Sequence, residues 1–168
     1  MEASARLSDS LQAVLVDLIE LHVQGKQAHW NIVGKNFRDL HLHLDVIVDA
    51  ARVFADQVAE RMRSLDAIPD GSSSTVAKTT TLPPLDAGEI DTADAVTSIT
   101  QRLDAAVAAV RGVHDAVEEE DPTTADLLHA IIERLEQLSW MTRSENRTPR
   151  MPSSSKRTPA AKSASRKS

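Results

Sequence analysis

The sequence predicts an all-α protein, a bundle of four long helices with one long crossover loop between the second and third. Apolar residues recur at spacings of three and four over four long segments. Aromatic residues make up only 2% of the chain, and Tyr is absent. The core must therefore consist of Leu, Val, Ile and Ala, which suits packed helices better than a β-sandwich.

Two helices are expected in the first half of the chain. Ser8 or Asp9 is expected to cap the first one, and Asn36 the second, after an interruption at Gly34. The stripe of the first helix consists of Leu11, Val14, Leu15, Leu18, Leu21 and His22. The stripe of the second consists of Leu40, Leu44, Ile47, Ala51, Phe54, Val58, Met62 and Leu65. The turn residues that follow, 68–71, end it.

Residues 70–85 are rich in Ser, Thr and Pro and are expected to form the crossover loop. A third helix is expected over roughly residues 92–119, and a fourth from Pro122, capped by Asp121, to about Asn146. Two short joins and one long crossover give the connectivity of ferritin-like bundles. We therefore expect one ferritin-like four-helix bundle over residues 1–147, although a fold alone does not define a function.

Composition excludes several classes of protein. The chain has no Cys, which excludes disulfide frameworks, thiolate zinc sites and Cys nucleophiles, and fits a reducing cytosol. No apolar run approaches the ~20 residues of a membrane span, and the N-terminus does not resemble a signal peptide. We expect a soluble, cytoplasmic protein without membrane partners.

Charge divides the chain into two parts. The net charge is -6, but residues 1–146 have a balance of -13 and residues 147–168 a balance of +7. The basic part has no acidic residue, and its cations are Arg147, Arg150, Lys156, Arg157, Lys162, Arg166 and Lys167. Residues 148–168 lack apolar periodicity, so we expect a disordered basic tail with a partner of its own.

A di-iron centre inside one bundle requires Glu-x-x-His pairs on two helices. No Glu stands three residues before any of the six His, and the nearest match is the single pair Asp126 and His129. The sequence therefore disfavours an internal centre.

Another set of ligand-type residues lies on the first two helices. His29 is near the end of the first helix, His41 and Asp45 are one turn apart early in the second, and Asp56 and Glu60 are one turn apart near its other end. His41 and Asp56 lie ~22 Å apart along a straight helix with an angular offset of ~60°. One chain cannot close a site from them, whereas two antiparallel copies can. Imidazole and carboxylate without thiolate suit Fe(II), Mn(II) or Zn(II).

Simpler roles remain open on spacing alone. Asp56 and Glu60 also fit a solvated acidic face, and Asp45 also fits an ion pair with Arg52 or Arg38.

The run His29-Trp30-Asn31-x-x-Gly34-x-x-Phe37-x-x-Leu40-His41 resembles the signature of the Dps family, miniferritins that protect DNA in starved bacteria. So does the continuation Asp56-x-x-Ala59-Glu60-Arg61, as does the segment from Asp126 to Trp140. The resemblance covers about residues 8–146 and is nearest to the actinobacterial branch.

This resemblance implies a hollow dodecamer that acts as a ferroxidase. It implies oxidation of Fe(II), preferably by hydrogen peroxide, and a ferric core in the cavity. The ligands that it implies are His29, His41 and Asp45 from one subunit and Asp56 and Glu60 from its two-fold partner.

Three further residues have two possible roles. Trp30 corresponds to a Trp thought to quench radicals in the family, but interface packing is an equal alternative. Asp121 and Asp126 match the acidic pore for iron uptake, and N-capping or helix-dipole pairing is their alternative.

The chain departs from the family in lacking a long Lys-rich N-terminal arm, because residues 1–9 contain one Arg and two acids. Only the basic tail can replace that arm, so we expect non-specific, tail-dependent DNA binding and association with the nucleoid. There are two alternatives. One is an architectural DNA-binding protein that uses the bundle as a scaffold, and the other is a purely structural cage.

Overall fold

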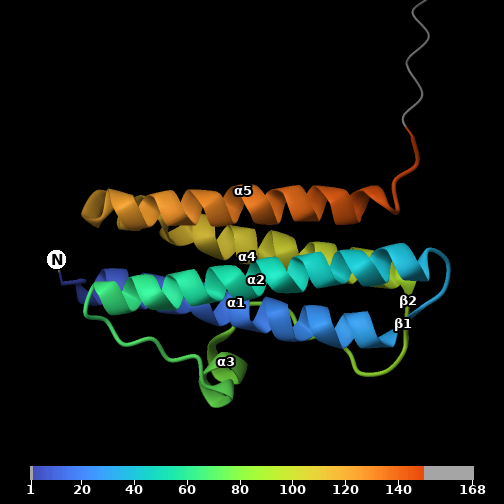
Figure 1. Ribbon diagram of the computed structural model, residues 1–168, viewed down its shortest axis with the longest axis horizontal. Helices are drawn as coiled ribbons and strands as arrows, with labels where there is room; N and C mark the ends of the chain where they lie inside the picture. The colour runs from blue at the N-terminus through green and yellow to red at the C-terminus, as the bar shows by residue number, and fades with distance from the viewer. Residues whose placement is uncertain (1, 150–168) are drawn as a thin grey trace, which may run out of the picture.

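A computed structural model describes residues 2–149 and has the predicted all-α architecture (Figure 1). Its elements are α1 (Ala5–Asn31), β1 (Ile32–Val33), α2 (Phe37–Ser64), α3 (Ser73–Thr79), β2 (Ile90–Asp91), α4 (Thr92–Glu120) and α5 (Pro122–Ser144). The hairpin of α1 and α2 packs against the hairpin of α4 and α5, with α1 on α4 and α2 on α5. Among these residues, none of the helices combines the length and apolarity needed to cross a membrane.

The apolar stripes of the four long helices meet along the axis of the bundle. Their largest side chains are almost fully inaccessible to solvent, including Leu11, Leu18, Leu44, Ile47, Ile99, Leu103, Leu128 and Ile131. Burial of a Leu or Ile side chain stabilises a fold by about 1.5–3 kcal/mol, so this core makes the helices a rigid frame for residues on their outer faces.

The first helix begins earlier than the sequence predicted, because Ser4 rather than Ser8 or Asp9 caps it. The Ser4 hydroxyl oxygen accepts a hydrogen bond from the Leu7 amide at 3.1 Å. Ser4 in turn donates from its amide and its hydroxyl to the Glu120 carboxylate, at 2.9 and 2.6 Å. This cap depends on the end of α4, which no local pattern shows.

The crossover is not entirely a loop, since it contains the short helix α3, and it is fastened to the bundle by buried polar groups. The Asp17 carboxylate accepts hydrogen bonds from the Thr80 hydroxyl and from the amide and hydroxyl of Thr81. The buried Arg102 guanidinium donates to the Pro84 carbonyl. These contacts hold an irregular segment in one position against α1 and α4.

Strands β1 and β2 form a parallel pair of two residues each, in which Ile32 lies opposite Ile90. This pair joins the α1–α2 turn to the end of the crossover. Gly34 follows this pair with a φ of +123°, a left-handed conformation that favours glycine. A Cβ here would lie 2.9 Å from Asp91 Oδ2 and 3.0 Å from Thr92 Oγ1. Gly34 therefore lets the chain turn tightly between the ends of α1 and α2 that bear His29 and His41.

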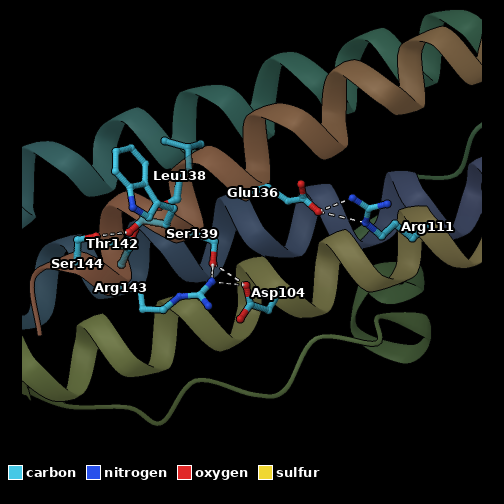
Figure 2. Close-up of polar contacts among 9 residues, drawn as sticks. Asp104, Arg111, Glu136, Leu138, Ser139, Thr142, Arg143 and Ser144 are labelled. Carbon is cyan, nitrogen blue, oxygen red and sulfur yellow. Dashed lines mark hydrogen bonds and ion pairs between the residues drawn. The ribbon is translucent and has the colours of Figure 1, made fainter. Parts of the chain in front are cut away.

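Polar contacts also tie α4 to α5 on their exposed faces (Figure 2). Arg111 Nη2 lies 2.5 Å from Glu136 Oε1. Asp104 Oδ1 accepts hydrogen bonds from the Ser139 hydroxyl at 2.5 Å and from Arg143 at 3.2 Å. Exposed pairs of this kind contribute about 0–1 kcal/mol each, so they mainly fix the register of the hairpin.

Candidate metal centre

The α1–α2 turn brings the two candidate ligand histidines together. His29 lies near the end of α1 and is buried, and His41 lies in the first turns of α2 and is partly buried. Their rings stack with centroids 3.6 Å apart and planes inclined by 25°. The sequence predicted both as ligands of one site, and the structure places them side by side.

Each histidine contacts the backbone of the other. His29 Nδ1 lies 3.0 Å from the His41 carbonyl oxygen, and His41 Nδ1 lies 3.0 Å from the His29 carbonyl oxygen. A carbonyl oxygen only accepts, so each Nδ1 must carry the hydrogen. In a neutral imidazole the lone pair then belongs to Nε2, the atom that can bind a metal ion. The fold therefore prepares both rings as ligands.

Asp45 lies one turn further along α2, and its Oδ1 is 2.5 Å from Lys26 Nζ and 3.2 Å from His29 Nδ1. The hydrogen bond from Lys26, together with the charge of Lys26, outweighs desolvation and holds the pKa of Asp45 below its ordinary value. The carboxylate is thus anionic at neutral pH. The alternative pairing of Asp45 with Arg52 or Arg38 was wrong, because Lys26 holds this position.

The second half of the candidate centre lies at the other end of α2. Asp56 and Glu60 are both exposed, and Asp56 lines a 790 Å³ groove between α1 and α2 with His22 and Asp49. On one continuous helix, Asp56 remains ~22 Å from His41. Among residues 2–149 of a single chain, no three His, Asp or Glu side chains form a cluster that could hold a metal ion. The two halves are therefore not brought together within one chain.

An apolar strip separates the two halves on the outside of α2. Leu42, Val46 and Val53 are 50%, 41% and 53% exposed, at the helical spacings of one face. The small, partly buried Ala50 lies between them, midway between the histidine and carboxylate halves. Exposed apolar side chains on one helix face are typical of a protein–protein interface.

Trp30 follows His29 and is 68% exposed on the single chain. It lines a 410 Å³ groove together with Val23, Lys26 and Pro84. Its exposure fits interface packing, while a role with radicals stays a prediction.

The two acidic residues predicted for the pore differ in their surroundings. Asp126 is exposed, whereas Asp121 is buried at the α4–α5 bend. Asp121 Oδ2 lies 2.6 Å from Arg61 Nη2 and also accepts a hydrogen bond from the Thr124 hydroxyl. Although Asp121 precedes α5, its side chain makes no cap hydrogen bond. Asp121 is thus an anchor between α2 and the bend, and only Asp126 is open to solvent.

Burial raises the pKa of Asp121, but the hydrogen bonds from Thr124 and Arg61 and the charge of Arg61 outweigh burial and hold the pKa below its ordinary value. The anchor is therefore an ion pair at neutral pH.

Sequence reasoning missed two features that bear on metal chemistry. Lys26 stands three residues before His29, a helical spacing that indicates a shared face. His114 and His129 stand at matching positions on either side of the α4–α5 bend, and their Nε2 atoms are 2.7 Å apart. The sequence did carry a signal for this second pair. The two histidines stand at equal distances from the bend at Pro122, which places them opposite each other in an antiparallel hairpin.

The basic tail lies almost entirely outside the described residues. Arg147 is described and exposed. Residues 150–168 are not among the described residues, so the predicted disorder of residues 148–168 lies mostly outside them. The other six cations also lie outside: Arg150, Lys156, Arg157, Lys162, Arg166 and Lys167.

Comparison with known proteins agrees with this fold. Residues 8–151 match the family model of the ferritin-like domain. A DNA protection during starvation protein of Mycolicibacterium smegmatis is 32% identical over 82% of this chain and 75% of its own length. The chain therefore belongs to the Dps family of ferritin-like proteins.

Other relatives differ in length and in name. DNA protection during starvation protein 2 of Deinococcus radiodurans is 34% identical over 80% of this chain, which spans only 56% of that protein. The fine tangled pili major subunit of Haemophilus ducreyi is 36% identical over 82% of this chain and 72% of its own length.

Solved structures agree as well. The crystal structure of Dps92 from Deinococcus radiodurans aligns with a TM-score of 0.82 at 33% identity, over 86% of this chain and 88% of that one. Dps from Microbacterium arborescens in its high iron form aligns with a TM-score of 0.80 at 30% identity, over 86% and 97%.

Proposed function

We propose that this protein oxidises Fe(II) at centres shared between two chains and stores the ferric product. The observation that carries the proposal is the reciprocal contact of His29 and His41, which leaves both Nε2 lone pairs free for a metal ion. The names of relatives, which include DNA protection and a high iron form, support the same activity.

A two-fold axis near Ala50 would complete the centre. With two α2 helices antiparallel, His29, His41 and Asp45 of one chain face the partner's Asp56 and Glu60, and each dimer gains two equivalent centres. The apolar strip of Leu42, Val46 and Val53 then becomes buried at the dimer interface. Its burial supplies the driving force for pairing the two helices.

The chemistry follows from the ligand types. Imidazole and carboxylate bind Fe(II), and anionic oxygens favour the higher charge of Fe(III). Two ferrous ions each give one electron to hydrogen peroxide, which takes up two protons and leaves as two waters. Lys26 and His29 both contact Asp45 Oδ1, so Oδ2 remains available to the iron.

Twelve chains in a hollow shell would provide a cavity for the ferric mineral, and the exposed Asp126 would line the pore for iron uptake. We place this assembly in the cytoplasm. Asp121 takes no direct part in such a pore, because Arg61 and Thr124 occupy its carboxylate.

Kinetics of ligand variants test the centre. His29→Ala and Asp56→Ala are expected to slow peroxide-driven Fe(II) oxidation strongly, measured by the absorbance of the ferric product after anaerobic loading. His43→Ala, a non-ligand histidine of α2 that contacts Thr142 at 3.0 Å, is the matched control. Rates equal to wild type in both ligand variants, with the assembly intact, would reject the assignment.

Co-assembly tests whether the centre is shared. Chains carrying His29→Ala/His41→Ala are mixed with chains carrying Asp56→Ala/Glu60→Ala during refolding. Activity should reappear, because each mixed dimer regains one intact centre. A centre inside one chain would stay inactive in every mixture.

We propose DNA binding by the basic tail as a second activity. Residues 147–168 have a balance of +7 and residues 1–146 a balance of -13, so phosphate should be attracted only to the basic end of the chain. Many tails on one assembly raise avidity by ~10²–10⁴, and binding should be sequence-independent and lost at high salt. Association with the nucleoid would follow.

A plasmid gel shift at low and high salt, with the full chain and a chain ending at Arg147, tests this role. The shortened chain should form the same oligomer and leave DNA unshifted. An equal shift by both chains would exclude the tail. DNA binding by the unmodified full chain without any Fe(II) oxidation would instead favour the architectural role.

A further inference from the structure

A second pair of histidines faces across the α4–α5 hairpin, on different helices from the candidate iron centre. His114 and His129 lie seven residues before Asp121 and seven after Pro122, so each is two turns from the bend. Their Nε2 atoms are 2.7 Å apart, and the ring planes are inclined by 40°. The hairpin therefore holds two imidazole nitrogens head to head at the surface.

A carboxylate lies beside the outer nitrogen of each ring. Asp115 Oδ1 is 3.2 Å from His114 Nδ1, and Asp126 Oδ1 is 3.8 Å from His129 Nδ1. The hydrogen bond to Asp115 favours the tautomer with hydrogen on His114 Nδ1, which leaves a lone pair on His114 Nε2. Asp126 lies too far from His129 Nδ1 for a hydrogen bond, so in the metal-free chain His129 Nε2 donates its hydrogen to His114 Nε2. A cation that takes the place of this shared hydrogen would bind both Nε2 atoms, with the hydrogen of His129 moved to Nδ1 beside Asp126.

We propose that His114 and His129 form a binding site for a divalent transition-metal ion that prefers imidazole, such as Zn(II). At a Zn–N distance of about 2.0–2.1 Å, two tetrahedral ligands lie about 3.3 Å apart, so the rings need to separate by only about 0.6 Å. The side chain of His129 is 58% exposed and has the freedom to do so. Asp115 and Asp126 then act as outer carboxylates that orient the ligands.

The surroundings leave room for the ion and for water. The site opens into a 190 Å³ pocket lined by Arg111, His114, Asp115, His129 and Ile132. The charge of Arg111 is neutralised by Glu136 at 2.5 Å (Figure 2). Since no third His, Asp or Glu among residues 2–149 completes the cluster, water takes the remaining positions, and the ion is exchangeable.

Zinc titration of the assembled protein tests this site. Calorimetry should count one Zn(II) per chain fewer in His114→Gln/His129→Gln than in wild type. In His41→Ala/Asp56→Ala, which disrupts the candidate iron centre, this zinc should persist. Asp126→Asn should weaken the same zinc by about 10- to 100-fold, the effect of losing an outer carboxylate.

Controls separate binding from folding and from the proposed iron activity. Assembly size and circular dichroism should match wild type, and His129→Gln alone, at the more exposed position, repeats the test. An unchanged zinc count in His114→Gln/His129→Gln would overturn the site. So would complete loss of zinc in His41→Ala/Asp56→Ala. Neither outcome depends on whether the protein oxidises iron.

Discussion

The Arg61–Asp121 anchor offers a direct test of whether Asp121 is structural or belongs to the iron pore. Arg61, near the end of α2, donates to Asp121 Oδ2 at 2.6 Å and to Thr124 Oγ1 at 2.8 Å. The side chains of Arg61 and Asp121 are 27% and 9% exposed, so solvent screens the pair only in part. In Arg61→Met, the carboxylate would lose its charged partner and keep the Thr124 hydroxyl.

The expected loss follows from this geometry. Removal of one partner from a buried ion pair costs about 3–5 kcal/mol, and the partial exposure of Arg61 lowers the expected loss to about 2–3 kcal/mol of unfolding free energy. For a chain of this size the midpoint of thermal unfolding should fall by roughly 4–12 °C. Circular dichroism at one fixed protein concentration measures it, because the stability of an oligomer depends on concentration.

The pH dependence has a defined sign. The pKa of Asp121 is lower in the folded chain than in the unfolded one. The anchor therefore contributes fully above the unfolded pKa of about 3.9 and is lost as pH falls through the folded pKa. Wild type and Arg61→Met should differ equally at pH 6 and 7, and the difference should shrink below about pH 4.

Asp121→Asn completes a double-mutant cycle, with an expected coupling of about 1–2 kcal/mol. Asp126→Asn, at an exposed position, is the control and should change stability by less than about 0.5 kcal/mol. Unchanged stability in Arg61→Met would refute the anchor. Slower iron uptake in Asp121→Asn at unchanged stability would instead assign that carboxylate to the pore.

Three further changes test how the fold supports the candidate centre. Leu44→Ala should lower the unfolding free energy by about 2–5 kcal/mol, measured by chemical denaturation, because it opens a cavity in a fully buried position. Gly34→Ala should lower the unfolding free energy by about 1–3 kcal/mol, because an Ala is strained at this left-handed φ. It should also slow iron oxidation by moving the turn beside His29. Unchanged stability together with an unchanged oxidation rate would contradict this prediction. Ser4→Ala should lower thermal stability by about 1 kcal/mol through loss of the α1 cap, with Ser8→Ala as a control near zero.

The four long helices were predictable because their periodicity is a local property. The short elements were not, since α3 and the β1–β2 pair are held by contacts between distant segments. Asp17 shows the reason: its carboxylate binds Thr80 and Thr81, more than sixty residues away, and nothing near Asp17 in the sequence indicates this. The start of α1 was missed for the same reason, because Ser4 depends on Glu120.

The candidate centre was predictable as two half-sites, because helical spacing fixes which residues share a face. His41 with Asp45, and Asp56 with Glu60, follow from a spacing of four. The tautomers of the two histidines and the contact of Lys26 with Asp45 were not predictable. They depend on the tight turn after α1, whose geometry is a property of the folded chain.

The interior of the bundle supports the location of the proposed iron centre at an interface between chains. The inward positions of α2 hold Leu44, Ile47, Ala51, Val58 and Met62, all buried and none able to bind a hard cation. Burying carboxylates there without a metal would destabilise the chain, since an unpaired buried charge is costly. Placed on the outside of α2, the carboxylates of Asp45, Asp56 and Glu60 keep contact with solvent in a single chain. In the proposed dimer they meet only when a partner arrives, so folding does not depend on iron, whereas the complete centre depends on assembly.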